Sequence, residues 1–158
     1  MTDHKKKDII FFFPAFIIWI ILLVVTSFQN LQHLLYTMQS PMNVVGALIF
    51  IVGLVITVNA QMTLKLNYSS TLRIREGHQL ITHGIYKYVR HPVYTGTLLR
   101  TFAIPIYVTS LLGFLFALMG IPLFIYRIGV EEKMLIEEFG DEYLEYTKDT
   151  WKLLPYIY

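Results

Sequence analysis

The sequence contains no cysteine and has few charged residues. Without cysteine the chain can form no disulfide and offers no thiolate ligand to a metal. Charged residues make up 15% of the 158 residues, whereas a soluble domain carries roughly a quarter. The formal net charge of +2 is too small to indicate nucleic-acid binding. With 55% hydrophobic residues, this deficit in charge indicates a protein that resides in a lipid bilayer.

One long stretch, residues 9–64, has no Lys, Arg, Asp or Glu. Within it, residues 9–28 are apolar or small and would span about 30 Å as a helix, the thickness of a hydrocarbon core. A second apolar run follows, and a third region, 93–126, carries a single charge and is long enough for two spans with a tight turn near 110–113. We therefore expect an all-α integral membrane protein, one domain of residues 1–158 with about four transmembrane helices. The expected spans are about 9–28, 42–61, 93–109 and 112–127.

The basic residues are unevenly distributed between the two ends of these spans. Twelve of the 13 Lys and Arg residues precede the first span, lie between the second and third, or follow the fourth. The positive-inside rule then places both termini and the middle loop in the cytoplasm. Eight of the 11 acidic residues lie in 131–149, on the same side. We expect a cytoplasmic active site built from segments 77–96 and 127–155, against the inner ends of the helices.

The segment before the third span combines basic residues with a helix start. Pro92 fits the first turn of a helix, where its missing N–H costs nothing. Arg90 and His91 would then lie at the mouth of the span, near free backbone N–H groups that favour an anionic ligand. Gly84 and Gly96 allow close backbone approach or unusual dihedral angles. The simpler alternative is that the basic pair marks the membrane boundary.

The tail contains a periodic apolar face and a pair of carboxylates. Apolar and aromatic residues recur at spacings of four, four and three, at Leu135, Phe139, Tyr143 and Tyr146. This spacing predicts one face of a helix that continues out of the fourth span. The Glu131 and Glu132 carboxylates are candidates to bind ribose hydroxyls or to hold a cationic sulfonium. The alternative is an ordinary surface helix, with an exposed Arg127–Glu131 pair contributing about 0.3–0.5 kcal/mol.

Arg100 is the one charge inside an expected span. Charged residues at such positions are rare, costly and usually functional. Two roles are open: pairing with Glu131 or Glu132, or contact with the head group of a lipid substrate.

Together the two segments resemble the isoprenylcysteine carboxyl methyltransferase and phospholipid methyltransferase family. The family pattern Gly-x-Tyr-x-x-x-Arg-His-Pro-x-Tyr-x-Gly matches residues 84–96 without a mismatch. The second pattern, Arg-x-x-x-Glu-Glu-x-x-Leu-x-x-x-Phe-Gly-x-x-Tyr-x-x-Tyr, matches residues 127–146. Both occur in this order and are separated by a hydrophobic hairpin, so the resemblance is specific over about the last 75 residues.

The resemblance implies methyl transfer from S-adenosylmethionine, without a metal, to a lipophilic acceptor that enters sideways from the bilayer. The implied reaction is carboxyl O-methylation of an isoprenylcysteine-like substrate. A phospholipid, or another small lipophilic amine or phenol, is the alternative acceptor. Membrane lipids are the expected surroundings, and the sequence does not indicate an oligomeric state.

The resemblance also implies roles for individual residues, in a pocket between the Arg-His-Pro segment and a cytoplasmic C-terminal helix. The implied cofactor-binding residues are Arg90, His91, Tyr94, Gly96, Glu132, Tyr143 and Tyr146. The basic pair would contact the amino-acid end of the cofactor, and the two tail tyrosines would line its adenosyl side. The expected catalytic residues are Glu132, Glu131 and Arg100.

Two further classes of protein fit the hydrophobic pattern less well. Membrane sterol reductases share a related C-terminal architecture and use NADPH, but they are much larger. A non-enzymatic four-helix transporter, such as an anion carrier, would leave both cytoplasmic motifs unexplained.

Overall fold

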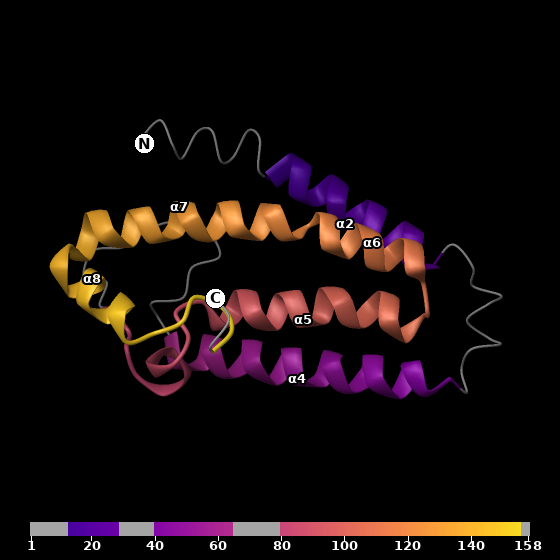
Figure 1. The fold of residues 1–158 in the computed structure, drawn as a ribbon, viewed down its shortest axis with the longest axis horizontal. Coiled ribbons are helices and arrows are strands. Elements are labelled where there is room, and N and C mark those ends of the chain that lie inside the picture. Colours follow the sequence, from indigo (N-terminus) through magenta and orange to yellow (C-terminus); the bar gives the residue numbers. More distant parts are fainter. Residues whose placement is uncertain (1–12, 29–39, 65–79, 156–158) are drawn as a thin grey trace. The chain divides into compact units, whose positions relative to one another are not determined.

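The computed structural model describes residues 13–28, 40–64 and 80–155 (Figure 1). Apart from one isolated β-bridge, these residues form helices and their connections, in agreement with the expected all-α class. The elements are α2 (Phe13–Phe28), α4 (Pro41–Leu64), the 3-10 helix η3 (Gly84–Lys87), α5 (Pro92–Tyr107), α6 (Leu111–Met119), α7 (Ile121–Phe139) and α8 (Asp141–Lys148). Predictions that concern the first lysines, the start of the first span and most of the middle loop lie outside the described residues.

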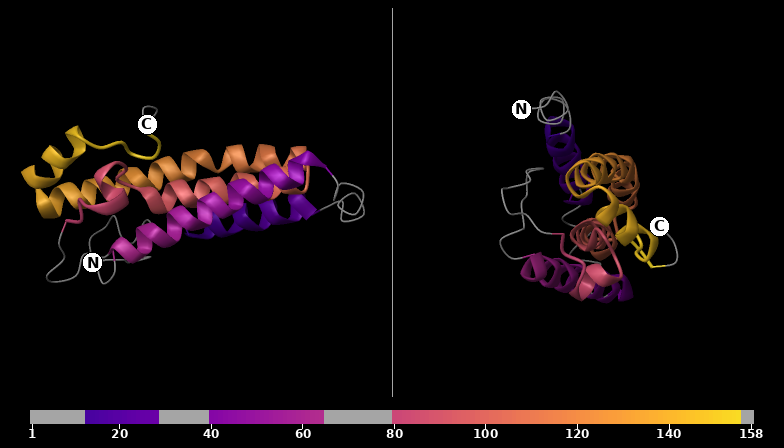
Figure 2. Two further views of the ribbon diagram at one scale, coloured as in Figure 1. Left: turned by 90° about the horizontal axis from the view of Figure 1, so that it is seen from below. Right: turned by 90° about the vertical axis from the view of Figure 1, so that its left-hand side faces the viewer.

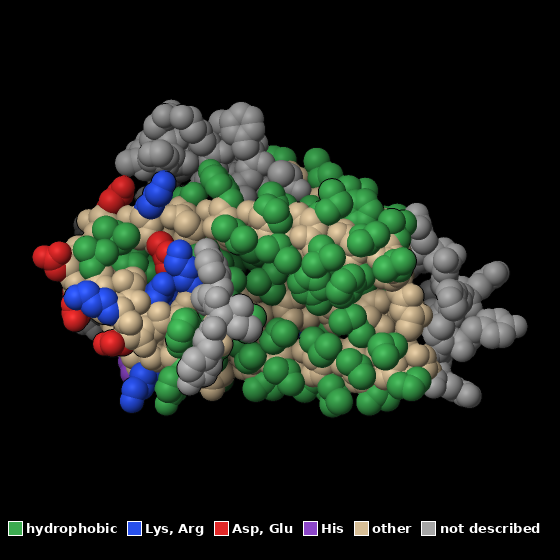
Figure 3. Space-filling model, viewed as in Figure 1, with side chains coloured by type: hydrophobic (Ala, Val, Ile, Leu, Met, Phe, Trp, Pro, Cys, Tyr) green, Lys and Arg blue, Asp and Glu red, His purple; other side chains and the backbone are tan. Residues whose placement is uncertain are grey.

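Within the described residues, two helical stretches are long and apolar enough to cross a bilayer, namely α4 and residues 111–139. Phe16–Ser27 in α2 is a shorter apolar helix. Large apolar side chains of α4 are exposed, with 62% of Val44, 58% of Leu48 and 68% of Met62 accessible. Figure 3 shows hydrophobic side chains over much of the visible surface of the long helices. A water-soluble protein rarely exposes so much apolar surface, and lipid is the solvent that suits it.

The chain divides into two compact units. Unit 1 comprises Met1–Ile51 and Leu99–Ile125, and unit 2 comprises Val52–Leu98 and Tyr126–Tyr158. The boundaries fall within helices, so α4, α5 and α7 each contribute residues to both units. The two segments that carry the sequence motifs both belong to unit 2.

In unit 1, α2 and α6 lie side by side (Figure 1, Figure 2). The Trp19 indole Nε1 donates a hydrogen bond to the Phe116 carbonyl at 2.7 Å. The Trp19 ring lies against Gly120, where a Cβ atom would come within 1.9 Å of Trp19 Cζ2. The Phe16 and Phe124 rings pack on the same indole, with centroids 5.5 and 5.8 Å away. Gly120, at the break between α6 and α7, therefore makes room for the main aromatic contact of unit 1.

The turn between α5 and α6 agrees with the tight turn expected in this region. Thr109 has a φ angle of 51°, in the left-handed region. Ser110 caps α6, because its Oγ accepts a hydrogen bond from the Gly113 N–H at 3.0 Å. The same hydroxyl donates to the Thr26 carbonyl at 2.9 Å, so the turn is also tied to α2.

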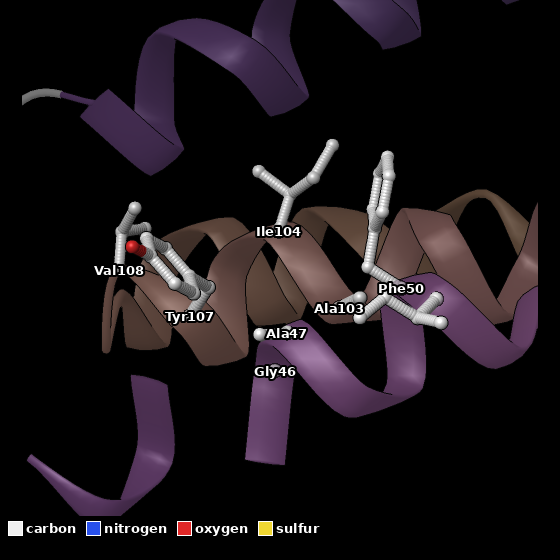
Figure 4. A pocket seen from close by; sticks show the side chains of 8 residues that line it. Gly46, Ala47, Phe50, Ala103, Ile104, Tyr107 and Val108 are labelled. Carbon is white, nitrogen blue, oxygen red and sulfur yellow. The ribbon is translucent and has the colours of Figure 1, made fainter. Parts of the chain in front are cut away.

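The unit 1 parts of α4 and α5 approach closely. The Asn43 side-chain amide donates to the Tyr107 carbonyl, and a Cβ at Gly46 would lie 2.6 Å from Tyr107 N. Small residues allow this approach in membrane helix pairs. Beside the contact is an apolar pocket of about 320 Å³ (Figure 4), which is lined by Gly46, Ala47, Phe50, Ile51, Ala103, Ile104, Tyr107 and Val108.

In unit 2, the single continuous tail helix predicted from the aromatic spacing was wrong. α7 ends at Phe139, and α8 begins at Asp141. Gly140 between them has a φ angle of 53° and a ψ angle of −126°. This backbone conformation is open to glycine and strained for other residues. The glycine of the second motif therefore turns the chain between Phe139 and Tyr143.

Candidate active site

The chain before α5 and the chain after α8 run alongside each other in unit 2. Val89 and Trp151 form a parallel β-bridge. Three backbone hydrogen bonds accompany it, from Trp151 N to Tyr88 O (3.0 Å), from Arg90 N to Trp151 O (2.8 Å) and from His91 N to Lys152 O (3.0 Å). The Thr95 hydroxyl adds a bond to the Leu153 carbonyl at 2.7 Å. We call residues 150–153 the C-terminal strap. It places Lys152 beside the Arg-His-Pro segment.

The Arg90 side chain joins the Arg-His-Pro segment to α7 and to the end of α8. Its Nε donates to Glu132 Oε1 at 3.1 Å. Its Nη1 donates to the Thr147 carbonyl at 3.0 Å and to the carbonyl and hydroxyl of Thr150. The last carbonyls of a helix have no intrahelical partner, so the guanidinium satisfies oxygens that α8 leaves open. The Arg90 side chain is 8% exposed, and its Nε and Nη1 atoms both donate hydrogen bonds within the protein.

Glu132 is the centre of the charged cluster. Its Oε1 lies 3.1 Å from Arg90 Nε and 3.4 Å from His91 Nε2, while its Oε2 lies 2.9 Å from Lys152 Nζ. Burial raises the pKa of the Glu132 carboxyl, but His91 and Lys152 lower it by more, and the net pKa is about 2 instead of 4.5. Glu132 is therefore ionised at neutral pH.

Glu131 has different partners. The Tyr94 hydroxyl donates to Glu131 Oε2 at 2.7 Å, and Arg127 also forms a hydrogen bond with the Tyr94 side chain. Glu131 Oε1 lies 3.9 Å from His91 Nδ1. Arg127 is 6% exposed, so the interpretation of Arg127 and Glu131 as an exposed surface pair was wrong. The Arg-x-x-x-Glu-Glu spacing places the arginine one helical turn before the carboxylates, but this spacing does not tell a buried pair from an exposed one.

Two buried polar atoms of the cluster have no hydrogen-bond partner among the described residues. They are Nε2 of His91, a residue 3% exposed, and Oη of Tyr143, a residue 1% exposed. Burial raises the pKa of Tyr143, as does the charge of Glu132, so its hydroxyl stays protonated and able to donate. Buried polar atoms are nearly always paired in folded proteins. The Tyr143 hydroxyl therefore has an unused donor beside Glu132, whereas His91 Nε2 has the Glu132 Oε1 atom 3.4 Å away.

Tyr146 packs beside Tyr143 but is already paired. Its hydroxyl donates to the Tyr86 carbonyl at 2.6 Å, and the two tyrosine ring centroids lie 5.9 Å apart. Burial raises the pKa of Tyr146 to about 12. Tyr146 therefore links α8 to η3, whereas Tyr143 offers an unpaired donor.

The structure brings six of the predicted site residues into one cluster in unit 2, namely Arg90, His91, Tyr94, Glu131, Glu132 and Tyr143. Gly96 packs elsewhere, because a Cβ there would lie 2.3 Å from Thr57 Oγ1 on α4. Arg100 belongs to unit 1. The pocket-lining role of Gly96 and the catalytic role of Arg100 stay predictions.

Sequence reasoning missed one member of the cluster, Lys152. Its position in the sequence marked it only as a cytoplasmic basic residue, because it follows the second motif and shares no helical spacing with Glu132. The strap brings the two together. Charged side chains gather around α8 in Figure 3, and within the described chain no group of three or more His, Asp or Glu side chains is arranged to hold a metal ion.

Comparisons with known proteins identify the family of the chain. The model of the isoprenylcysteine carboxyl methyltransferase family matches residues 44–137. A probable protein-S-isoprenylcysteine O-methyltransferase from Oryza sativa subsp. indica is 33% identical over 141 residues, which cover 83% of this chain and 74% of the relative. The protein-S-isoprenylcysteine O-methyltransferase of Dictyostelium discoideum is 33% identical over 119 residues, covering 72% of this chain and 49% of the relative.

A solved structure of a eukaryotic intramembrane Ras methyltransferase, an isoprenylcysteine carboxyl methyltransferase, superposes with a TM-score of 0.75 at 26% identity. The match covers 91% of this chain and 53% of that chain, so this chain spans about half the length of the solved relative. The fold and these matches together identify a membrane methyltransferase. The chain belongs to the isoprenylcysteine carboxyl methyltransferase family.

Proposed function

We propose that this chain transfers a methyl group from S-adenosylmethionine to the carboxylate of an isoprenylated cysteine. The observation that carries the proposal is the convergence of both motif segments in unit 2 around the Glu132 carboxylate and the buried Tyr143 hydroxyl, which has no hydrogen-bond partner among the described residues. The names of the relatives supply the acceptor class.

The residues of the cluster fit the methyl donor. Its amino-acid end and ribose carry groups that accept hydrogen bonds, and Tyr143 has a buried hydroxyl to donate. Glu132, which is ionised, supplies negative charge for its cationic groups, and the Glu131 side chain lies next to it in the sequence. When bound, the donor supplies an electrophilic methyl group on a sulfonium. The chain would hold and orient it, and positioning of this kind can supply several kcal/mol of a displacement barrier.

A carboxylate acceptor needs no general base. A bond forms between the acceptor oxygen and the methyl carbon while the carbon–sulfur bond breaks, its electron pair staying on sulfur. No proton is transferred in this step. An amine or phenol acceptor would need a general base. The candidates are His91, Glu131 and Glu132, and both carboxylates are already held by other side chains.

We further propose four spans, formed by α2, α4, α5 and the continuous path of α6 with the first part of α7. Both termini and the site would face the cytoplasm, because the basic residues lie on that side. The acceptor would enter from the bilayer between helices, and Arg100 would contact its carboxylate or head group.

Donor binding and acceptor choice are tested separately with detergent-purified protein. Isothermal titration should show saturable binding of S-adenosylhomocysteine and none of NADPH. Transfer of a labelled methyl group should be observed to N-acetyl-S-farnesylcysteine but not to its methyl ester, which lacks the free carboxylate. Methyl transfer to phosphatidylethanolamine, measured in parallel, tests the alternative acceptor.

The His91→Ala and Glu132→Ala variants should lose turnover while staying folded. His83→Ala is the matched control, because His83 is exposed in the same part of the chain and should leave turnover unchanged. Wild-type turnover in both site variants would show that the site has been assigned wrongly. Methyl transfer to phosphatidylethanolamine alone would show that the acceptor is a phospholipid amine and not an isoprenylated cysteine.

A further inference from the structure

The apolar pocket of unit 1 opens at the surface of the helix pair α4 and α5. Gly46, Ala103 and Val108 line it and are buried, so they form its floor. Phe50 and Tyr107 also line it, and they are 40% and 38% exposed. In the view of Figure 4, Gly46 and Ala103 lie between these two rings. The pocket is therefore a notch between two aromatic side chains, closed on the side of the protein and open on the other.

The open side of the pocket faces hydrocarbon. Ile51, which also lines the pocket, is 55% exposed, and Val44 and Leu48 on the same helix are 62% and 58% exposed. The helix that carries them, α4, is long and apolar enough to cross a bilayer. Exposed apolar surface of this extent suits lipid and not water. Acyl chains are therefore the material that meets the opening.

The lining of the pocket selects an apolar occupant. None of the eight lining residues is charged, and the Tyr107 hydroxyl is their only polar side-chain group. A polar group in such a pocket would lose its hydrogen bonds without replacement. The volume of about 320 Å³ equals that of the smaller ligand sites of proteins. If the pocket stayed empty, its lining atoms would lack van der Waals partners, and an alkyl chain supplies them.

The position of the pocket along the helices decides which leaflet supplies the chain. α4 begins at Pro41, and α5 ends at Tyr107. Gly46 lies five residues past Pro41, which is about 7.5 Å along the helix axis. The pocket thus lies one to two turns below the end of the helices at which α5 turns into α6. A phospholipid of the leaflet at this end reaches the pocket with the first carbons of one acyl chain.

We propose that this pocket binds one acyl chain of a membrane phospholipid from the leaflet at the α5–α6 end. Lipid tails are as apolar as the pocket, so the binding comes from van der Waals contact and not from transfer out of water. Residues 9–64 and 101–126, which include the ends of both helices here, carry no charge. The site therefore recognises the chain and not a charged head group. It belongs to unit 1 alone and is independent of the methyl transfer proposed for unit 2.

The test uses the full chain in phosphatidylcholine nanodiscs that contain a phosphatidylcholine with a diazirine on the upper part of one acyl chain. After irradiation, mass spectrometry should find the label concentrated on residues 103–108. Ala47→Phe places a ring in the pocket and should lower this labelling about tenfold, as the loss of roughly ten carbon–carbon contacts implies. Ala47→Leu fills less of the pocket and should lower it by less. A phosphatidylglycerol probe with the same chain should label these residues as strongly.

Leu48→Phe is the matched control. Leu48 follows Ala47 on α4, is exposed and does not line the pocket, so the labelling of residues 103–108 should be unchanged. Undiminished labelling in both Ala47 variants would overturn the inference, and so would label spread evenly over the exposed residues of α2 and α4. Displacement of the probe by N-acetyl-S-farnesylcysteine would also overturn it, because the pocket would then hold the methyl acceptor. Labelling requires no methyl donor, so these outcomes are separate from those that test the proposed function.

Discussion

Around Trp19 in unit 1 the buried contacts join aromatic rings to a glycine, whereas around Glu132 in unit 2 they join charges. The first contact fits because a hydrogen atom stands where a Cβ would lie 1.9 Å from the indole. The second depends on three side chains that converge on one carboxylate. Close apolar packing thus joins the helices around Trp19, whereas ion pairs and hydrogen bonds join the segments around Glu132.

The difference follows from the surroundings that each of the two contacts suits. Charge is costly in hydrocarbon, so helices there associate through close packing of small residues and single hydrogen bonds. A cluster of charges costs less free energy where water or protein dipoles can solvate it, and its fixed charged groups can then bind a charged ligand. The packing around Trp19 therefore contributes to stability, while the polar cluster around Glu132 contributes to stability and, in the proposed function, also to binding.

The largest expected effect is at Arg90 in unit 2. Arg90→Ala leaves Glu132 with fewer partners and removes the donors to Thr147 and Thr150. Breaking a buried ion pair on one side costs about 3–5 kcal/mol. Thermal unfolding in detergent should show the loss. Lys87→Ala, an exposed basic residue of η3, should unfold like the wild type; similar unfolding of both variants would show that the cluster does not hold unit 2 together.

Glu132 should make the stability of the protein depend on acid. Its folded pKa of about 2 lies below the ordinary 4.5, so its contribution is present above about pH 4.5 and is lost as the pH falls toward 2. The shift corresponds to about 3 kcal/mol as an order of magnitude. The difference in melting temperature between wild type and Glu132→Gln should therefore shrink between pH 5 and about pH 3. A difference that does not change with pH would contradict this origin.

Gly120 tests the packing of unit 1. Gly120→Ala forces the Trp19 ring to move, and overpacking of this kind costs about 1–3 kcal/mol. Gly129→Ala is the matched control, because no atom lies within 4 Å of its added Cβ. Alanine is the better helix former there, so the control should be as stable as wild type or slightly more stable. Equal melting temperatures for the two variants would argue against the Trp19 contact.

The smallest effects separate the two adjacent tyrosines. Tyr146→Phe removes the bond to the Tyr86 carbonyl and should cost about 0.5–1.5 kcal/mol of stability. Tyr143→Phe removes a hydroxyl that has no partner among the described residues, so stability should not fall. Binding of S-adenosylhomocysteine should weaken in Tyr143→Phe and not in Tyr146→Phe. The reverse pattern would mean that the unpaired hydroxyl does not face the ligand.

Several features could be predicted from the sequence because they depend on neighbours along the chain. The all-α class followed from long apolar runs, since a backbone in lipid must satisfy its hydrogen bonds internally. The start of α5 at Pro92 followed from the missing N–H of proline. The two motifs predicted that Arg90, His91 and the glutamate pair lie at one site; the structure places these residues together, and their roles stay predictions.

Other features required the tertiary structure. The bend at Gly140 replaced the predicted continuous helix, because a glycine in a helical pattern does not reveal its φ angle in advance. The burial of Arg127 and the contact of Lys152 with Glu132 depend on segments far apart in sequence. Periodicity describes one helix at a time. The pairing of charges across segments was decided by the strap, whose hydrogen bonds join residues about 60 positions apart.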